Sequence, residues 1–354
     1  MKPAYFFKDK PIFGLDIGYN NLKVMQITKH ASKNFVTGYG TASFDFDAFS
    51  KDGTINAPEK IAKATLDLFS KNLVGDISTR RVVISVPAAR TFTRTMTMPK
   101  MGKKQLAEAV RQESEQYIPM PSDQLYMDYT IISETEKDVE LLAVAIPRRI
   151  ADSYMELSQI LGLDVVALET TISASCRLFI HTERSDVPTV LIDFGTVSSD
   201  ITIYDDALIV TSTVLGGGDS FTELIAKYLG MSKEDANTIK SKYGLGVSKK
   251  QKEISEALAP LLDQLLKEIR RMIRYYEDRN TTKRKISQIV TLGGGASMPG
   301  LSEFMTSRLR LPVRMCDPWH KLSFSHIPPP NSLGKSLYGT VAGLALIESQ
   351  EIFE

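Results

Sequence analysis

The feature of this sequence that most constrains its fold is a strand-turn-strand pattern that occurs twice. The first copy, IFGLDIGYNNLKVMQI at residues 12–27, is an apolar run that ends in Asp16, turns at Gly18 and continues in strand-like alternation. The second copy, TVLIDFGTVSSDITIY at residues 189–204, ends its apolar run in Asp193 and turns at Gly195. The two aspartates, at 16 and 193, are 177 residues apart, which is half of the 354-residue chain. The spacing predicts two related halves.

Each Asp-x-Gly hairpin has a chemistry that can be read from its residues. Glycine lets the backbone turn tightly and approach an anion, so that successive N–H groups form a cradle for phosphate oxygens. A carboxylate beside such a cradle would repel phosphate, but it can hold a hydrated magnesium ion that contacts it. A single hairpin of this kind is more often a plain β-turn. Two copies at matching positions favour a clamp on one polyphosphate, with Asp16 and Asp193 as the metal-binding carboxylates.

Two glycine-rich segments belong to the same set. LGGGDSFTELIAKYLG places three glycines, 216–218, before a predicted helix whose N-terminus could face a phosphate. VTLGGGASMPGLSEFM runs from a Val-rich strand into glycines 293–295, and then into a Pro-Gly turn and a helix. Each segment alone could be a packing device. Neither completes the G-x-G-x-x-G of a Rossmann site.

Composition excludes several classes of protein. Lysine and arginine number 43 against 42 aspartates and glutamates, so the net charge of +1 provides no field for nonspecific binding of nucleic acid or anionic membrane. Cys176 and Cys316 have neither disulfide-framework nor metal-type spacing, which favours a reducing, cytoplasmic compartment. No apolar run approaches the roughly 18 to 20 residues of a membrane span, and MKPAYFFKDK lacks the apolar core of a signal peptide. We expect any membrane association to be indirect.

The order of these motifs resembles the actin-like ATPase superfamily over nearly the whole chain. By this resemblance, Lys23, seven residues after Asp16, would contact the β- or γ-phosphate, and Asp200, seven after Asp193, would orient the attacking water. Glu169 in DVVALETTISASCRLF would lie near that water, on the first connecting helix. The resemblance implies ATP or ADP with Mg²⁺ as the cofactor. The nucleotide contacts would come from Asp16, Gly18, Tyr19, Asn20, Lys23, Gly195, Thr196, Ser198, Gly216, Gly217, Gly218, Asn237, Lys240, Gly293, Gly294, Gly295 and Met298.

Three departures from the superfamily pattern bear on hydrolysis. The first hairpin carries bulky Tyr19, Asn20 and Asn21 where relatives have small hydroxyl residues. The second carries Thr196 and Val197 in place of two glycines. Asn237 stands where relatives have an adenosine-binding glutamate, although Lys240 is retained, and asparagine can still accept a hydrogen bond from a ribose hydroxyl. We therefore expect ATP to bind, and to be hydrolysed slowly or not at all.

The segment between the hairpins favours one branch of the superfamily. TMTMPKMGKKQLAEAVRQESEQYIPMPSDQLYMDYTII, followed by VELLAVAIPRRIADSYMELSQILGL, closely resembles the PilM family of type IV pilus assembly and is also similar to FtsA. KEIRRMIRYYEDR at residues 267–279 resembles the PilM helix that precedes the adenosine segment. The resemblance implies an actin-like α/β fold of two RNase H-like domains with inserted subdomains. We expect subdomain 1A at 1–91 and 166–186, 1C at 92–165, 2A at 187–215 and 286–354, and 2B at 216–285.

By the same resemblance, the chain would be a cytoplasmic scaffold of the inner-membrane pilus complex. It would bind the short N-terminal cytoplasmic peptide of a PilN-like membrane protein in a groove between 1A and 1C, and could contact other pilus assembly proteins or a second copy of itself. The break Tyr117, Ile118, Pro119 is a candidate for part of this groove, or a structural turn. Gly339 and Gly343 would allow the last helix to approach the connecting helix at Ser173, Ala174 and Ser175.

Two alternatives remain open from the sequence. An FtsA-like filament-forming division protein would normally end in a basic amphipathic helix, but this chain ends in the acidic ALIESQEIFE. A small-molecule kinase or chaperone ATPase of the superfamily would need a substrate-side carboxylate or a peptide-binding domain, and no segment is evident for either.

Overall fold

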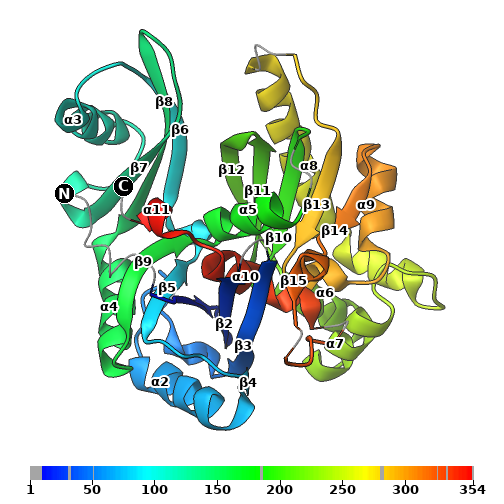
Figure 1. Cartoon of the computed structure of the whole chain (residues 1–354). Coiled ribbons are helices and arrows are strands. Elements are labelled where there is room, and N and C mark those ends of the chain that lie inside the picture. Colours follow the sequence, from blue (N-terminus) through cyan, green and yellow to red (C-terminus); the bar gives the residue numbers. More distant parts are fainter. Residues whose placement is uncertain are drawn as a thin grey trace. The chain divides into compact units, whose positions relative to one another are not determined.

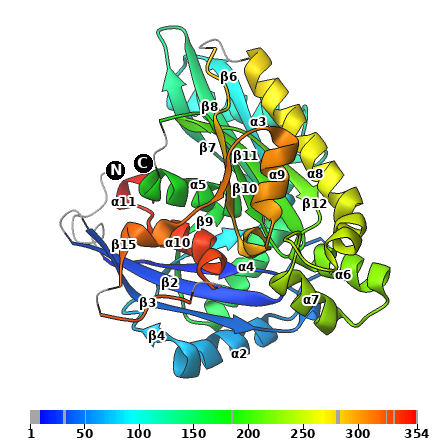
Figure 2. The same cartoon turned by 90° about the vertical axis from the view of Figure 1, so that its right-hand side faces the viewer.

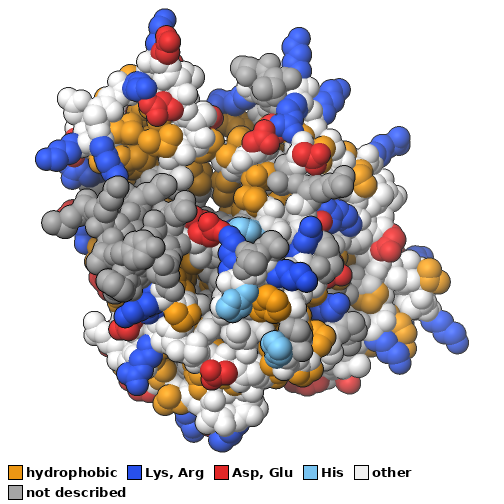
Figure 3. Space-filling model, viewed as in Figure 1, with side chains coloured by type: hydrophobic (Ala, Val, Ile, Leu, Met, Phe, Trp, Pro, Cys, Tyr) orange, Lys and Arg blue, Asp and Glu red, His pale blue; other side chains and the backbone are white. Residues whose placement is uncertain are grey.

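The computed structural model describes residues 10–30, 33–50, 52–183, 186–279, 283–324, 326–331 and 334–352. The chain divides into two compact units, which are described separately (Figures 1 and 2). Unit 1 comprises residues 1–174, 323–328 and 341–354, and unit 2 comprises residues 175–322 and 329–340. No helix within the described ranges is both long and apolar enough to cross a bilayer. Acidic side chains lie among the lysines and arginines on the face seen in Figure 3.

Unit 1 is built on a mixed sheet with strand order β15-β3-β2-β1-β5-β9. β2 is antiparallel to β1 and β3, whereas β5 runs parallel to β1 and β9. Short β4 pairs with β3. Apolar residues of β1 and β5 are almost fully buried, because helices α2 and α4 pack on the sheet. The elements are β1 Phe13–Ile17, β2 Asn21–His30, β3 Lys33–Ser43, η1 Phe46–Ala48, α2 Pro58–Asp67, η2 Leu68–Asn72, β4 Val74–Gly75, β5 Arg81–Val86, η3 Ala88–Arg90, α4 Arg148–Ile160, β9 Asp164–Thr170 and β15 Leu322–Ser323.

Unit 2 repeats this architecture with strand order β12-β11-β10-β13-β14. β11 is antiparallel to its two neighbours, and β10, β13 and β14 are parallel. The long helix α8 buries one side against the core of the unit, and Figure 2 shows α9 lying alongside it. The elements are β10 Thr189–Phe194, β11 Ser198–Asp205, β12 Ala207–Leu215, α6 Gly218–Leu229, α7 Lys233–Lys242, α8 Gln251–Arg279, β13 Gln288–Leu292, η5 Gly294–Ser297, α9 Leu301–Leu309, β14 Val313–Met315, η6 Pro318–His320 and η7 Lys335–Tyr338.

The two halves correspond at the level of single hydrogen bonds. Asp16 pairs with Lys23 across β1 and β2, and Asp193 pairs with Asp200 across β10 and β11. In the first turn the Gly18 amide donates to the Asn21 carbonyl at 2.8 Å, and in the second the Gly195 amide donates to the Ser198 carbonyl at 2.9 Å. All of these positions differ by 177 residues. The prediction of two related halves is confirmed.

A separate three-stranded antiparallel sheet, ordered β6-β8-β7, is inserted in unit 1. Its strands are β6 Phe92–Pro99, β7 Leu125–Glu134 and β8 Asp138–Pro147, with α3 Lys103–Ser114 and η4 Ser122–Gln124 between β6 and β7. Alternate residues of β6 and β8 point to α3 and are buried, which gives this segment a core of its own. Figure 1 shows α3 on one side of the sheet.

Helices α5 (Thr171–Thr182) and α10 (Gly339–Ala345) each span a boundary between the units, and α11 (Ser349–Ile352) lies near the end of the chain. A Cβ at Gly343 would lie 1.9 Å from the Ala174 carbonyl oxygen, so only glycine fits there. A Cβ at Gly339 would find its nearest neighbour, a Leu178 methyl, at 3.8 Å. The predicted close approach of the last helix to the connecting helix is confirmed at Gly343 and Ala174, both in unit 1.

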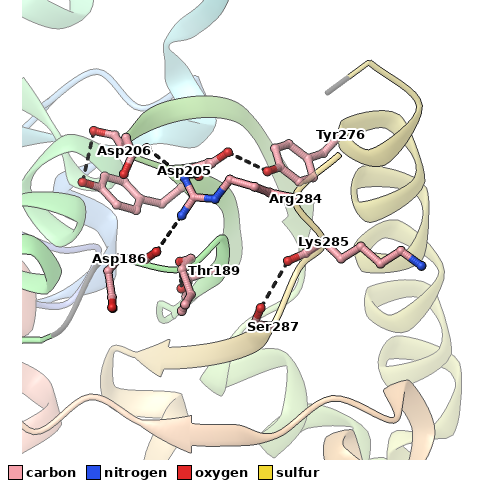
Figure 4. A network of polar contacts seen from close by, with 10 residues as sticks. Asp186, Thr189, Asp205, Asp206, Tyr276, Arg284, Lys285 and Ser287 are labelled. Atoms are coloured by element: carbon pink, nitrogen blue, oxygen red, sulfur yellow. Dashed lines mark hydrogen bonds and ion pairs between the residues drawn. The ribbon is translucent and has the colours of Figure 1, made fainter. Parts of the chain in front are cut away.

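A polar network fixes the β11–β12 turn of unit 2 (Figure 4). Arg284 forms ion pairs with Asp205 at 2.5 Å and Asp206 at 2.8 Å, and it donates to the Asp186 carbonyl at 2.6 Å. The hydroxyl of Tyr276 donates to Asp205 at 2.6 Å, and burial together with this carboxylate raises the pKa of Tyr276. The network joins the end of α8 to the sheet, at the end of β11 away from the Asp-x-Gly turn.

Candidate functional site

The first hairpin places its charged residues on one row across the sheet. Lys23 Nζ lies 2.9 Å from Asp16 Oδ2, and Ser85 Oγ donates to Asp16 Oδ1 at 2.6 Å. Asp16 and Lys23 are both buried. Glu169 pairs in register with Ser85, so Lys23, Asp16, Ser85 and Glu169 occupy neighbouring positions on β2, β1, β5 and β9. The sequence did not single out Ser85, which lies 69 residues from Asp16.

Glu169 lies on a strand, and the expectation that it lies on the connecting helix is wrong. β9 extends to Thr170, and α5 begins at Thr171. The Thr170 hydroxyl accepts a hydrogen bond from the Ser173 amide at 3.1 Å, which satisfies a first-turn donor of the helix and sets its start. β-Branched residues in DVVALET favour the strand before it.

The tip of the first hairpin is bulky, as the sequence predicted. The Tyr19 ring contacts Phe46 and Phe49, with centroids 5.8 and 5.5 Å away. Asn21 donates from Nδ2 to Asn20 Oδ1 at 2.9 Å, and its own Oδ1 is buried without a hydrogen-bond partner. The glycine turn is retained, but Tyr19 and Asn20 beside it already contact other side chains.

The second hairpin differs from the first because its paired residues are both carboxylates. Asp193 Oδ2 accepts hydrogen bonds from Ser175 Oγ at 2.7 Å and Thr340 Oγ1 at 3.3 Å. Asp200 Oδ1 accepts one from Thr213 Oγ1 at 2.7 Å. Gly293 has φ +79°, and a Cβ there would lie 2.3 Å from Asp193 Oδ1. Two acidic groups at one strand end suit a divalent cation better than the ion-paired first hairpin does.

The segment that begins at Gly216 is hydrogen-bonded to the second hairpin. Amides of Gly216, Gly218 and Asp219 donate to the carbonyls of residues 197, 195 and 196, each at 2.9 Å. A Cβ on Gly217 would lie 2.3 Å from the Gly195 carbonyl oxygen. Three amides of this segment therefore bond to the hairpin, and the contact of the start of α6 with a phosphate stays a prediction.

The proposed adenosine residues lie within unit 2 in different environments. Lys240 Nζ donates to the Gly218 carbonyl at 2.8 Å and to Thr222 Oγ1 at 2.7 Å, and burial lowers the pKa of Lys240. Asn237, one turn earlier on α7, is exposed. Met298 is buried in the core of the unit, where a Cβ on Gly244 would meet it at 2.7 Å. Met298 therefore supports the segment after Gly295 through packing.

The inserted sheet has two different faces. Tyr117 and Ile118 lie on the α3 face: Arg94 covers the Tyr117 ring at 4.3 Å, and Ile118 is buried against Leu125 and Ala145. Pro119 is exposed. The expectation that Ile118 lines a partner groove is corrected, because its side chain belongs to the core.

The opposite face of this sheet is not covered by α3. Leu142, Val144 and Ile146 on β8 point to it and are half-buried, and Ile146 also packs against the main core of unit 1. Strand register places Thr93, Thr95, Asp128 and Thr130 on either side of them. The strip ends where Arg148 lies over the Tyr126 ring at 4.2 Å and Tyr126 donates to Asp152 at 3.0 Å. We call this surface, residues 93, 95, 126, 128, 130, 142, 144 and 146, the open face.

Solved structures define the class of protein. MreB5 of Spiroplasma citri bound to AMPPNP is 13% identical to this chain, with a TM-score of 0.55 over 97% of each chain. The ethanolamine utilization protein EutJ of Carboxydothermus hydrogenoformans is 14% identical, with a TM-score of 0.56 over 95% of this chain and 89% of that one. Both have the actin-like fold, and so has this chain.

The family follows from a more extensive match. A family model described as type IV pilus assembly protein PilM matches residues 14–349. This chain therefore belongs to the PilM family. A structure described as a PilM-PilN type IV pilus biogenesis complex is 22% identical to it, with a TM-score of 0.82 over 95% of this chain and 97% of that one.

Proposed function

We propose that this chain is an ATP-binding scaffold of a type IV pilus assembly complex, and that it binds the N-terminal cytoplasmic peptide of a PilN-like partner. The observation that carries the proposal is the agreement over 95% of the chain with a protein solved in a PilM-PilN complex. Association with the inner face of the cytoplasmic membrane would then depend on the partner. An FtsA-like or kinase role has no comparable support.

The geometry of both hairpins suits a magnesium nucleotide. Each turn has a glycine whose backbone can approach a phosphate. Asp193 and Asp200 would hold the hydrated metal and a water, and Lys23 would reach a phosphate at the expense of its pair with Asp16. Asn237 and Lys240 would contact the adenosine. Bound Mg²⁺-ATP would favour the conformation of the protein that binds it better, and slow hydrolysis would remove this preference.

For the partner, we propose the open face as the principal contact. A strip of half-buried apolar side chains, flanked by three threonines and Asp128, suits an extended peptide with alternating apolar residues. Arg148, Tyr126 and Asp152 at its end provide polar contacts of both charges. Tyr117 and Pro119 on the α3 face remain a second candidate, which binding experiments can separate from the first.

The test is binding of a fluorescent peptide from the cytoplasmic N-terminus of the PilN-like partner to the full chain. We expect saturable binding that Val144→Lys weakens at least about tenfold, because a charge enters the middle of the apolar strip. Ser133→Lys, exposed farther along β7, is the matched control. Loss of binding in a Tyr117→Ala/Pro119→Ala variant, with Val144→Lys unaffected, would move the site to the α3 face. If the wild type does not bind the peptide, the proposal that this chain binds a PilN-like partner is refuted.

A further inference from the structure

The carboxylate of Asp193 is bonded to the two helices in which the chain passes between its compact units. The chain first leaves unit 1 between Ala174 and Ser175, within α5, and makes its last return between Thr340 and Val341, within α10; its two other passages, after Leu322 and after Pro328, lie outside helices. Ser175 and Thr340 are thus the unit 2 residues at these two passages. Their hydroxyls both donate to one oxygen, Asp193 Oδ2, at 2.7 and 3.3 Å.

Local packing makes these two hydrogen bonds specific. Ser175 and Thr340 are 3% and 9% exposed, so neither hydroxyl can readily exchange its bond for one to water. Gly293, with φ +79°, leaves room for Asp193 Oδ1, because a Cβ at this position would lie 2.3 Å from that oxygen. The adjacent residues, Ala174 before Ser175 and Val341 after Thr340, already belong to unit 1. A change in the charge or position of this carboxylate therefore acts directly at both passages.

We infer that Ser175 and Thr340 are positioning residues that link occupancy of Asp193 to the conformation of α5 and α10. The inference rests on the proposed binding of a magnesium nucleotide at the second hairpin. A cation there withdraws electron density from the carboxylate that the two hydroxyls share, and so changes the strength of both hydrogen bonds. By linkage, if the ligand at Asp193 changes the affinity of a partner that binds at α5 or α10 by some factor, that partner changes the affinity for the ligand by the same factor.

Within the described ranges, the first hairpin shows no such link. Asp16 receives Lys23 and Ser85, which both belong to the sheet of unit 1. The corresponding aspartate of unit 2 instead receives hydroxyls from the two passage helices. This difference between otherwise matching hairpins assigns the signalling role to the second.

The experiment is amide hydrogen exchange of the full chain with and without Mg²⁺ and a slowly hydrolysed ATP analogue, followed by mass spectrometry. In the wild type we expect the ligand to slow exchange in peptides covering 171–182 and 339–346 by about fivefold or more. In Ser175→Ala/Thr340→Val the ligand should still slow exchange at 193–200, whereas its effect on the two helices should fall below about twofold. Ser175→Thr/Thr340→Ser, which keeps both hydroxyls, should restore the response. Thr182→Val, which removes an α5 hydroxyl bonded to the Leu178 carbonyl, should leave it unchanged.

The outcomes are distinct. A double variant that binds the analogue and keeps the full response in both helices overturns the inference while the nucleotide site stands. A wild type that binds the analogue without any change in these helices also overturns it. A wild type that shows no ligand-dependent change at 193–200 and no binding refutes the proposed nucleotide function, and the inference with it. If the double variant does not fold, Thr340→Val alone provides the same comparison.

Discussion

Lys23 and Asp16 form a buried ion pair at 2.9 Å, and the equivalent residues of the second half, Asp200 and Asp193, are both acids. The two hairpins therefore share a backbone design and differ in charge. In the first hairpin the ammonium group of Lys23 is paired with Asp16, so it would have to leave or share this pair in order to contact a phosphate. The second presents two carboxylates, and this asymmetry is why we place the metal ion chiefly at Asp193.

Lys23→Met should destabilise the protein by about 3 kcal/mol, because it leaves the Asp16 carboxylate buried without its cation. Denaturant unfolding provides the measurement. Asp16→Asn/Lys23→Met, which removes both charges, should cost clearly less than Lys23→Met alone. Equal losses in the two variants would contradict the role of the pair.

Asp193→Ala should abolish magnesium-dependent ATP binding, because the carboxylate at the second turn would hold the hydrated metal. Asp123→Ala, which removes an exposed acid from η4, is the control for a general loss of negative charge. Calorimetric titration of both variants with ATP, with and without Mg²⁺, gives the answer. An unaltered affinity in Asp193→Ala would exclude this residue as the metal-binding group.

Gly343→Ala and Gly339→Ala should differ in their effect on stability although the two glycines lie one turn apart on α10. The first places a methyl 1.9 Å from the Ala174 carbonyl oxygen, and we expect a loss of at least about 2 kcal/mol in the free energy of unfolding. The second meets only ordinary contact distances, and the helix propensity of alanine should make it neutral or slightly stabilising. Thermal unfolding of the two variants separates these results, and similar melting temperatures would disprove the close crossing.

Cys316 should make the stability of the protein fall in alkaline solution. Burial beside Glu183 raises the pKa of this thiol from 9.0 to about 12. Above pH 9 the unfolded thiol loses its proton while the folded one keeps it, so ionisation favours the unfolded state. The stability difference between wild type and Cys316→Ala should therefore decrease by about 1.4 kcal/mol from pH 8 to pH 10. Parallel stability curves for the two proteins would contradict the shift.

Local sequence was sufficient to predict the two hairpins, because an apolar run, an aspartate and a turn glycine lie within a few residues of each other. It could not identify Ser85 or Thr340, which reach their aspartates from positions 69 and 147 residues away. Nor could it predict the contacts of the amides of Gly216, Gly218 and Asp219, because their acceptors belong to the β10–β11 turn.

Strand β8 shows a different limit of sequence reasoning. VELLAVAI is almost continuously apolar, which is typical of a strand covered on both faces. The structure covers Leu141, Ala143 and Ala145 with α3 and neighbouring residues, and leaves Leu142 and Val144 half-buried. The inserted sheet has more apolar residues than its own core uses, and this excess is the sequence signal for the surface that we propose binds the partner.

The most direct test of a nucleotide-dependent scaffold is calorimetric titration of Mg²⁺-ATP into the full chain. We expect one site per chain, with a dissociation constant on the order of micromolar and a requirement for Mg²⁺. We expect ATP hydrolysis to be far slower than the ~10 per second turnover of a typical enzyme. Absence of heat at about millimolar nucleotide would contradict the proposed function.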